Sequence, residues 1–151
     1  CQFGTRFVMT EECRAHPRFK QAFRHAHARQ AVATPQYDSQ LPVVAVRALK
    51  NQGMESFGSL QFDLIQKIRN GEMTREQAQF EVERFWIGSL RRAVIDGDVD
   101  QGSLMAGQSV GLMRDIKPMK ESIQELVDQA DAELQRITDI TRHLRPEEHD
   151  R

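Results

Sequence analysis

Apolar side chains recur at intervals of three and four residues over much of this chain, which is the spacing of amphipathic helices. Local signals mark their ends: Asn70 and Gly71 are typical of a helix end, and Thr74 with Gln77 forms a capping box. Trp86 has apolar neighbours four residues before and after it, so it is predicted to be buried against the neighbouring helix. The predicted helices span residues 17–29, 59–69, 75–95 and 118–144.

Shorter runs of β-prone residues predict a few strands. Residues 1–9 read as a buried strand interrupted by Gly4, and residues 32–34 and 43–46 read as a short strand pair separated by prolines. The predicted fold class is therefore mostly α with a few short strands. A single strand at the start has no sheet to join, and the sequence opens on an apolar stretch without a Met, so we expect a piece of a larger protein.

The charge balance argues against two classes of partner. The 151 residues include 21 Lys and Arg and 22 Asp and Glu, so nothing electrostatic favours nucleic acid or an anionic membrane. No apolar run is long enough to span a bilayer. Two cysteines are too few for a disulfide framework, so a reducing, cytoplasmic setting is expected.

Residues 96–100, which read Asp-Gly-Asp-Val-Asp, have the beginning of a calcium loop. The glycine and the glutamate that such a loop needs at later positions are missing. The five histidines are not arranged as ligands on one helix face with a carboxylate, and solvated or capping roles suit them better. No metal site is predicted.

The stretch from Gly102 to Gly111 is small, uncharged and rich in glycine. Three glycines in ten residues suggest a close approach of the backbone to another group, and Gln108 and Ser109 add side chains that can donate and accept hydrogen bonds. Two interpretations remain open: small residues packed against a neighbouring element, or a segment that lies beside a ligand.

Several short motifs occur together in a distinctive order. The motifs are Phe3-Gly4-Thr5-Arg6-Phe7, Glu11, His16-Pro17-Arg18-Phe19-Lys20, Val46-Arg47-Ala48-Leu49-Lys50-Asn51, Phe85-Trp86-x-Gly88-x-Leu90-Arg91-Arg92-Ala93, Asp96-Gly97-Asp98 and Ala106-Gly107-Gln108-Ser109-Val110-Gly111. In this order they resemble the C-terminal part of the nitronate monooxygenase family, formerly called 2-nitropropane dioxygenases. The flavin-dependent enoyl-acyl-carrier-protein reductases of the same superfamily are similar here too, and the resemblance runs from Cys1 to about Ile137.

The resemblance implies an FMN-binding α/β TIM barrel with a helical lid domain, of which this chain is a C-terminal fragment. Residues 1–17 are then the last barrel strand and the following loop. Residues 18–95 form the lid domain, with helices and a short strand pair. Residues 96–151 form the return loop and the C-terminal helices that pack on the barrel, ending in a frayed tail.

The resemblance also implies the site. Gly4 and Thr5 match the family's Gly-Thr pair and are expected to bind the FMN phosphate, at a place where barrel enzymes commonly hold phosphate. Gln108 and Ser109 are expected to bind substrate in the cleft between lid and barrel. None of the five histidines matches the family's catalytic histidine, so no catalytic residue is assigned here and the isolated chain is expected to be inactive.

The expected function is that of an FMN-dependent oxidoreductase that oxidises alkyl nitronates with O2. One alternative is flavin-dependent reduction of enoyl thioesters, since fold-level analogy does not choose between the two. A non-catalytic helical interaction module is a third, supported by the helix from Pro118. The expected partners are a small-molecule substrate and the remainder of the barrel; a homodimer is allowed for.

Overall fold

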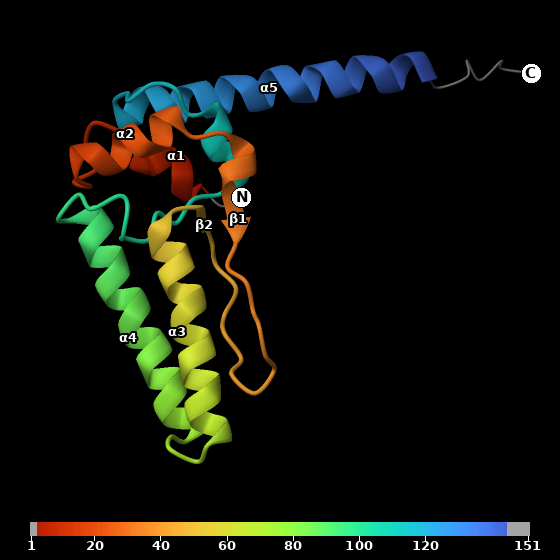
Figure 1. Cartoon of the computed structure of the whole chain (residues 1–151). Helices are drawn as coiled ribbons and strands as arrows, with labels where there is room; N and C mark the ends of the chain where they lie inside the picture. The colour runs from red at the N-terminus through yellow and green to blue at the C-terminus, as the bar shows by residue number, and fades with distance from the viewer. Residues whose placement is uncertain (1–2, 145–151) are drawn as a thin grey trace, which may run out of the picture.

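Helices make up most of the chain, and two three-residue strands pair in a small sheet (Figure 1). The computed structural model describes residues 3–144, and the predicted fold class, mostly α with a few short strands, is confirmed. In chain order the elements are α1 (Gly4–Val8), α2 (Pro17–His25), η1 (Ala28–Gln30), β1 (Ala31–Ala33), β2 (Arg47–Leu49), α3 (Gln52–Arg69), α4 (Arg75–Val94), η2 (Gln108–Leu112) and α5 (Met119–Leu144).

Residues 3–9 do not form the expected strand. From Gly4 to Val8 the backbone is a short helix, and Thr10 closes its end by donating its hydroxyl to the Phe7 carbonyl at 2.8 Å. A strand needs a partner along its length, and in the described part of the chain this stretch has only an isolated bridge between Thr10 and Lys117. Residues 1 and 2 of the predicted strand lie outside the described residues.

The predicted strand pair is present, with its second strand moved along the chain. β1 pairs antiparallel with β2, so that Ala31 lies opposite Leu49. The other edge of β2 meets the segment after α4: the Leu49 N–H donates to the Leu104 carbonyl at 2.9 Å, and the Ala106 N–H donates to the Arg47 carbonyl at 3.0 Å. Partners on both edges place the strand at residues 47–49 rather than at the β-prone run 43–46.

The helices α3 and α4 lie side by side as an antiparallel hairpin that extends away from the rest of the molecule (Figure 1). The capping box that opens α4 is confirmed: the Thr74 hydroxyl accepts from the Gln77 N–H at 3.2 Å, and the Gln77 side chain accepts from the Thr74 N–H at 2.9 Å. α3 begins seven residues earlier than predicted, because the Asn51 side chain caps it by accepting from the Met54 N–H at 3.1 Å.

A hydrophobic core holds the hairpin together, and we call it the hairpin cluster. The Trp86 ring lies 4.5 Å from the ring of Phe57 between centroids, so Trp86 packs on the neighbouring helix as predicted, although it is half-buried. The hairpin cluster consists of Leu41, Val43, Phe57, Leu64, Ile65, Ala78 and Val82.

A second core lies at the other end of the hairpin, and we call it the head cluster. Its members come from the residue after α1, from α2 and the residue that follows it, from both strands, from the end of α4 and from the segment 104–110, so it joins parts of the chain that are far apart in sequence. The head cluster consists of Met9, Phe19, Phe23, Ala26, Ala31, Leu49, Ala93, Leu104, Ala106 and Val110.

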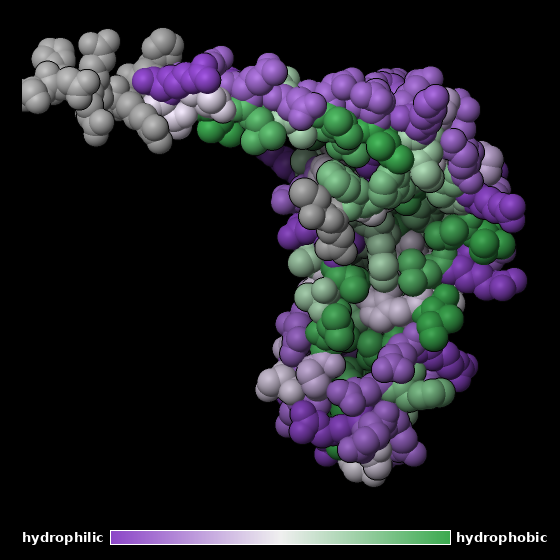
Figure 2. Space-filling model, turned by 180° about the vertical axis from the view of Figure 1, so that it is seen from behind, coloured by the Kyte–Doolittle hydropathy of each residue, from purple (hydrophilic) through white to green (hydrophobic). Residues whose placement is uncertain are grey.

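The last helix, α5, confirms the long helix predicted from Pro118 and projects past the body of the molecule (Figure 1). Hydrophobic residues follow one edge of α5 and hydrophilic residues follow the opposite edge (Figure 2). Within the described range, none of the helices is apolar over a length that could cross a membrane. The expected frayed tail from Arg145 onward lies outside the described residues. The exposed apolar side chains of α5 are Ile123, Val127, Leu134, Ile137 and Ile140.

Candidate functional site

An open groove of about 1290 Å3 lies between α1, the segment 105–117 and the first half of α5. Its size exceeds that of most small-ligand pockets, which hold about 300–1,000 Å3, so it has room for a cofactor and a substrate together. Gly4, Thr5 and Ser109, three of the four residues predicted from the sequence to bind ligands, line this groove.

A direct hydrogen bond joins the two predicted parts of the site. The Gly107 N–H donates to the Thr5 hydroxyl at 2.9 Å, across 102 positions of sequence. A Cβ added to Gly107 would lie 3.5 Å from the hydroxyls of both Thr5 and Ser109, so these groups surround one point. The glycine-rich stretch therefore lies beside the predicted cofactor residues, as the ligand interpretation of that stretch requires.

Gln108 takes a different position from Ser109. Both side chains are exposed at the start of η2, but Gln108 does not contribute to the lining of the groove. Ser109 thus lines the groove and Gln108 does not, and the substrate-binding roles expected of both residues stay predictions. Nothing obstructs Gly4, where an added Cβ would find no atom within 4 Å.

Charged side chains on the groove wall form a small network. The carboxylate of Glu125 on α5 accepts from the guanidinium of Arg6 on α1 at 3.1 Å and also pairs with the ammonium of Lys117. The hydrogen bond and charge of Lys117, reinforced by the charge of Arg6, hold the pKa of Glu125 below its usual value. The carboxylate therefore stays ionised and keeps α1 and α5 together.

Basic groups outnumber acidic ones along the groove. Arg6, Arg47, Arg114 and Lys117 face it together with Asp115 and Glu125. Arg47 donates to the Ala31 carbonyl at 2.7 Å, and Arg114 donates to the Arg24 and Ala26 carbonyls at 3.1 and 3.2 Å, which holds both guanidinium groups at fixed places. A positive excess in a partly enclosed groove attracts an anionic ligand.

Ser122 adds a hydroxyl that is completely buried at the edge of the groove. Within the described residues its oxygen has no hydrogen-bond partner. A buried hydroxyl without a partner is destabilising by roughly 1–3 kcal/mol, and Gln61 and Ser103, which do not line the groove, carry such atoms too.

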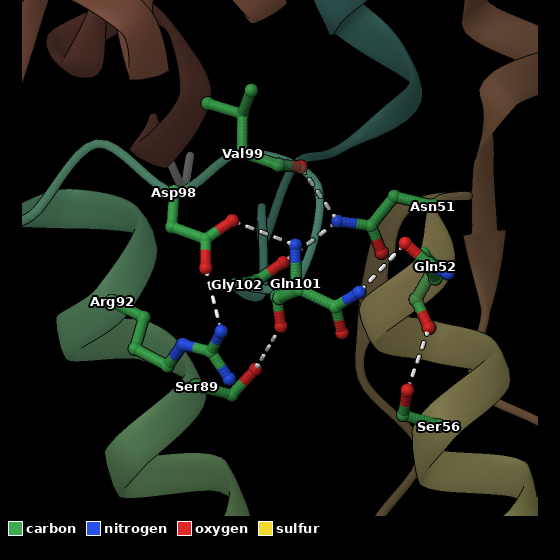
Figure 3. A network of polar contacts seen from close by, with 9 residues as sticks. All are labelled: Asn51, Gln52, Ser56, Ser89, Arg92, Asp98, Val99, Gln101 and Gly102. Atoms are coloured by element: carbon green, nitrogen blue, oxygen red, sulfur yellow. Dashed lines mark hydrogen bonds and ion pairs between the residues drawn. The ribbon is translucent and has the colours of Figure 1, made fainter.

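A polar network holds residues 98–102, the segment that follows α4, against the hairpin (Figure 3). The Asn51 side-chain amide donates to the Val99 carbonyl at 2.8 Å and to the Gly102 carbonyl at 2.7 Å, while its oxygen caps α3. Asp98 accepts from the Gln101 N–H at 2.9 Å and from Arg92 at 2.6 Å. Residues 98–102 are thereby fixed between α3 and α4, and the chain enters the groove from a defined position.

Asp98 lies in the acidic stretch 96–100 that begins like a calcium loop, and its carboxylate helps to hold residues 98–102 against the hairpin. The hydrogen bond from the Gln101 N–H, together with the Arg92 guanidinium, holds the pKa of Asp98 below its usual value. No group of three metal-binding side chains occurs between residues 3 and 144.

Sequence reasoning missed Asn51 as a connecting residue and missed the network of Arg6, Lys117 and Glu125. Asn51 carried a usable signal, because Asn is among the best N-cap residues, but Asn51, Gln52 and Gly53 together are also typical of a turn. A Cβ on Gly53 would lie 2.5 Å from the Gln101 carbonyl oxygen, so this glycine is there for close packing. Arg6 and Glu125 lie 119 positions apart, and no sequence signal connects them.

The family model for nitronate monooxygenase matches residues 1–129, and the chain belongs to this family. It is similar to the solved structure of FabK from Thermotoga maritima, with a TM-score of 0.69 and 29% identity over 91% of this chain and 38% of that chain. A single-site mutant of the same FabK matches with a TM-score of 0.62 and 26% identity, over 91% and 35%. A comparison with curated proteins gave no match.

The chain therefore spans 35–38% of the length of the FabK chains. This share agrees with the expectation that it corresponds to one part of a larger barrel protein with a helical lid. The domain limits expected at residues 17 and 95 stay predictions.

Proposed function

We propose that this chain forms one wall of the flavin and substrate site of an FMN-dependent oxidoreductase, and that the full-length protein oxidises alkyl nitronates with O2. The observation that carries the proposal is the hydrogen bond between Gly107 and Thr5. It joins the residues expected to bind the cofactor to the segment expected to bind the substrate, inside a groove of suitable size.

The residues present suit the phosphate of FMN. The Thr5 hydroxyl can donate a hydrogen bond, Gly4 leaves the backbone open to close approach, and the groove carries an excess of basic groups. A dianionic phosphate is stabilised by such a set of donors and charges. The acidic Glu125 stays neutralised by Arg6 and Lys117, so it does not repel an anion at full strength.

FMN, when bound, supplies the electron transfer from the nitronate to O2, and the protein supplies binding and orientation. In this chain Thr5 holds the phosphate end, and Ser109 offers a hydroxyl toward the nitro oxygens of the substrate. The network around Asn51 keeps the Ser109 segment in register with Thr5 by fixing residues 98–102. The proton-transfer group lies outside this chain.

The remainder of the barrel is the proposed partner of α5 and of the open groove. The apolar edge of α5 is exposed, and its side chains are 45–63% accessible. A helix with one apolar edge is typical of packing on a larger body. The cytoplasmic setting, the homodimer and the lack of nucleic-acid and membrane partners stay predictions.

Enoyl thioester reduction is the second candidate function. What favours it is the similarity to two FabK structures, because the resemblance extends to the flavin-dependent enoyl-acyl-carrier-protein reductases. The two reactions share the flavin site and differ in the substrate and in the electron donor or acceptor. This chain carries the part of the site that both need.

The two candidates are separated with the full-length protein. We expect it to purify with FMN, to consume O2 when given an alkyl nitronate, and to leave an enoyl thioester unchanged in the presence of a reduced nicotinamide. Reduction of the thioester without nitronate turnover would establish the second candidate. Absence of any flavin binding would contradict both and favour the helical interaction module.

Ser109→Ala tests the substrate role of this residue. Loss of one neutral hydrogen bond lowers kcat/KM about 2- to 13-fold while the flavin content stays unchanged. Ser59→Ala is the control, because Ser59 is exposed on α3 and its hydroxyl donates only within that helix. If both variants retain wild-type kcat/KM, Ser109 has no part in substrate binding.

A further inference from the structure

The Thr5 hydroxyl connects two segments of the groove wall. It accepts the Gly107 N–H at 2.9 Å, immediately before the 3₁₀ turn η2 that carries Ser109. A hydroxyl has two lone pairs and one hydrogen, and the bond to Gly107 uses one lone pair. The hydrogen of the same hydroxyl can therefore be donated to an acceptor in the groove while the bond to Gly107 persists.

We infer that Thr5 is a positioning residue that couples phosphate binding to the placement of residues 107–109, an inference that rests on the proposed FMN site. When a phosphate oxygen accepts the Thr5 hydrogen, the Thr5 oxygen becomes a stronger acceptor for the Gly107 N–H, because successive hydrogen bonds polarise one another. Cofactor binding thereby fixes Ser109 in the orientation that meets the substrate. By reciprocity, fixing Gly107 raises the affinity for the phosphate.

The two ends of η2 are held very differently, which makes its first residues responsive. Val110 is fully buried in the head cluster, and a Cβ on Gly111 would lie 2.8 Å from the Ala28 nitrogen, so this end cannot shift. Gln108 and Ser109 are exposed. On the Gly107 side, Ala106 is buried and pairs with β2, and the Gly107 carbonyl accepts the Val110 N–H at 3.0 Å. The bond from the Gly107 N–H to Thr5 is the contact there that reaches α1, and a change in its strength acts on residues 107–109.

Hydrogen exchange of the Gly107 amide tests the coupling in the full-length protein. The exchange rate is measured in the flavin-free protein, with saturating FMN, and with saturating riboflavin, which has the same ring system without the phosphate. FMN is expected to slow exchange at Gly107 about 10-fold or more, and riboflavin is expected to leave it within about 2-fold of the flavin-free rate.

Substitutions at Thr5 identify the hydroxyl as the connecting group. Thr5→Val removes the hydroxyl at constant shape, so FMN affinity falls roughly 10- to 100-fold while riboflavin affinity changes less than about 3-fold. Thr5→Ser keeps the hydroxyl and retains both the FMN affinity and the protection of Gly107. The ratio of FMN to riboflavin affinity is a readout that a general loss of stability does not move.

Thr34→Val is the matched control. The Thr34 hydroxyl also accepts a backbone N–H, that of Val46 at 3.1 Å, and it is buried away from the groove. This variant loses stability but is expected to keep the FMN-dependent protection of Gly107 and the wild-type ratio of affinities.

Several other outcomes would contradict the coupling between phosphate binding and residues 107–109. FMN binding without any change at Gly107 overturns the coupling and leaves the proposed flavin function standing. Equal protection by FMN and riboflavin also overturns it, since the phosphate then has no special effect. Failure to bind either flavin overturns the proposed function and the coupling together. If Thr5→Val does not fold, the comparison of FMN with riboflavin in the wild type and in Thr5→Ser still decides.

Discussion

The head cluster and the hairpin cluster are both built from buried apolar side chains, but they join the chain in different ways. The hairpin cluster is formed by two consecutive helices and the loop that covers them, residues 41–82. The head cluster brings residues 9–31 and Leu49 together with residues 93–110. Local contacts can therefore organise the hairpin, while the head depends on closing long loops of chain.

This difference bears on function because the segments that line the groove are held together by the head cluster. Thr5, Gly107 and Ser109 are held by contacts among distant segments, and the hairpin supplies only one side of the network at Asn51. A change in the head is expected to alter both stability and ligand binding. A change in the hairpin is expected to alter stability alone, and the predictions below compare the two regions on this point.

The largest effects are expected from emptying either core. Phe23 in the head cluster and Phe57 in the hairpin cluster are both fully buried, so Phe23→Ala and Phe57→Ala should each lower the free energy of unfolding by about 3–5 kcal/mol. Chemical denaturation measures these losses in the full-length protein. Only Phe23→Ala should also weaken FMN binding; an equal loss of affinity in Phe57→Ala would show that the two regions are not separate.

The next largest effects are expected from two glycines that have the same backbone conformation but lie in different regions. Gly71 in the hairpin and Gly97 near the head have φ values of 73° and 72°. Gly71→Ala should cost about 1 kcal/mol, because an added Cβ finds open space and only the backbone is strained. Gly97→Ala should cost about 2–4 kcal/mol, because its Cβ would also collide with the His16 ring.

Thermal denaturation of the two variants checks this order. Gly88→Ala serves as the control, since Gly88 lies inside α4 with no atom near an added Cβ, and the substitution should be neutral or slightly stabilising. Equal destabilisation by Gly71→Ala and Gly97→Ala would mean that the contact with His16 adds nothing.

The third largest effects on stability are expected from the residues that cap α3 and α4. Thr74 caps α4 only, so Thr74→Ala should lower the free energy of unfolding by about 1 kcal/mol. Asn51 caps α3 and also donates to two carbonyl groups of residues 99 and 102, so Asn51→Ala should cost about 2–3 kcal/mol.

Asn51→Asp sharpens the comparison, because it keeps the capping oxygen but replaces the donating amide by an acceptor that faces two carbonyl oxygens. It should be as destabilising as Asn51→Ala in urea unfolding. Wild-type stability in Asn51→Asp would show that capping of α3 is the whole contribution of Asn51.

The smallest effects are expected from the ion pairs. Because Lys117 and Arg6 lower the pKa of Glu125, the stabilisation from this carboxylate is complete above its ordinary, unfolded pKa and is lost as the pH falls through its lower folded pKa. Glu125→Gln should thus be less stable than wild type near pH 7, and the difference should shrink near pH 3.

Asp63→Asn removes the hairpin's exposed pair with Lys67 and should have a weaker effect, because a single exposed i, i+4 pair adds little. Denaturant midpoints at both pH values measure the two differences. A difference between Glu125→Gln and wild type that grows on acidification would contradict the assigned direction of the pKa shift.

Helix content, the limits of α4 and α5 and the packing of Trp86 on the neighbouring helix followed from the sequence alone. Helical periodicity and the capping box at Thr74 depend on residues three or four positions apart, so a single sequence contains them in full. The resemblance around Gly4, Thr5 and Ser109 implied a ligand site; the structure brings these segments together, and their ligand-binding roles stay predictions.

The helix at Gly4–Val8, the early start of α3 and the position of β2 were decided by tertiary structure. Each depends on a partner far along the chain: the segment 104–106 for β2, residues 99 and 102 for Asn51, and Gly107 for Thr5. An apolar run such as residues 1–9 suits a strand or a helix equally well, and only the neighbours available in the folded chain select one. Local spacing thus determined the elements, and contacts between distant residues determined the groove.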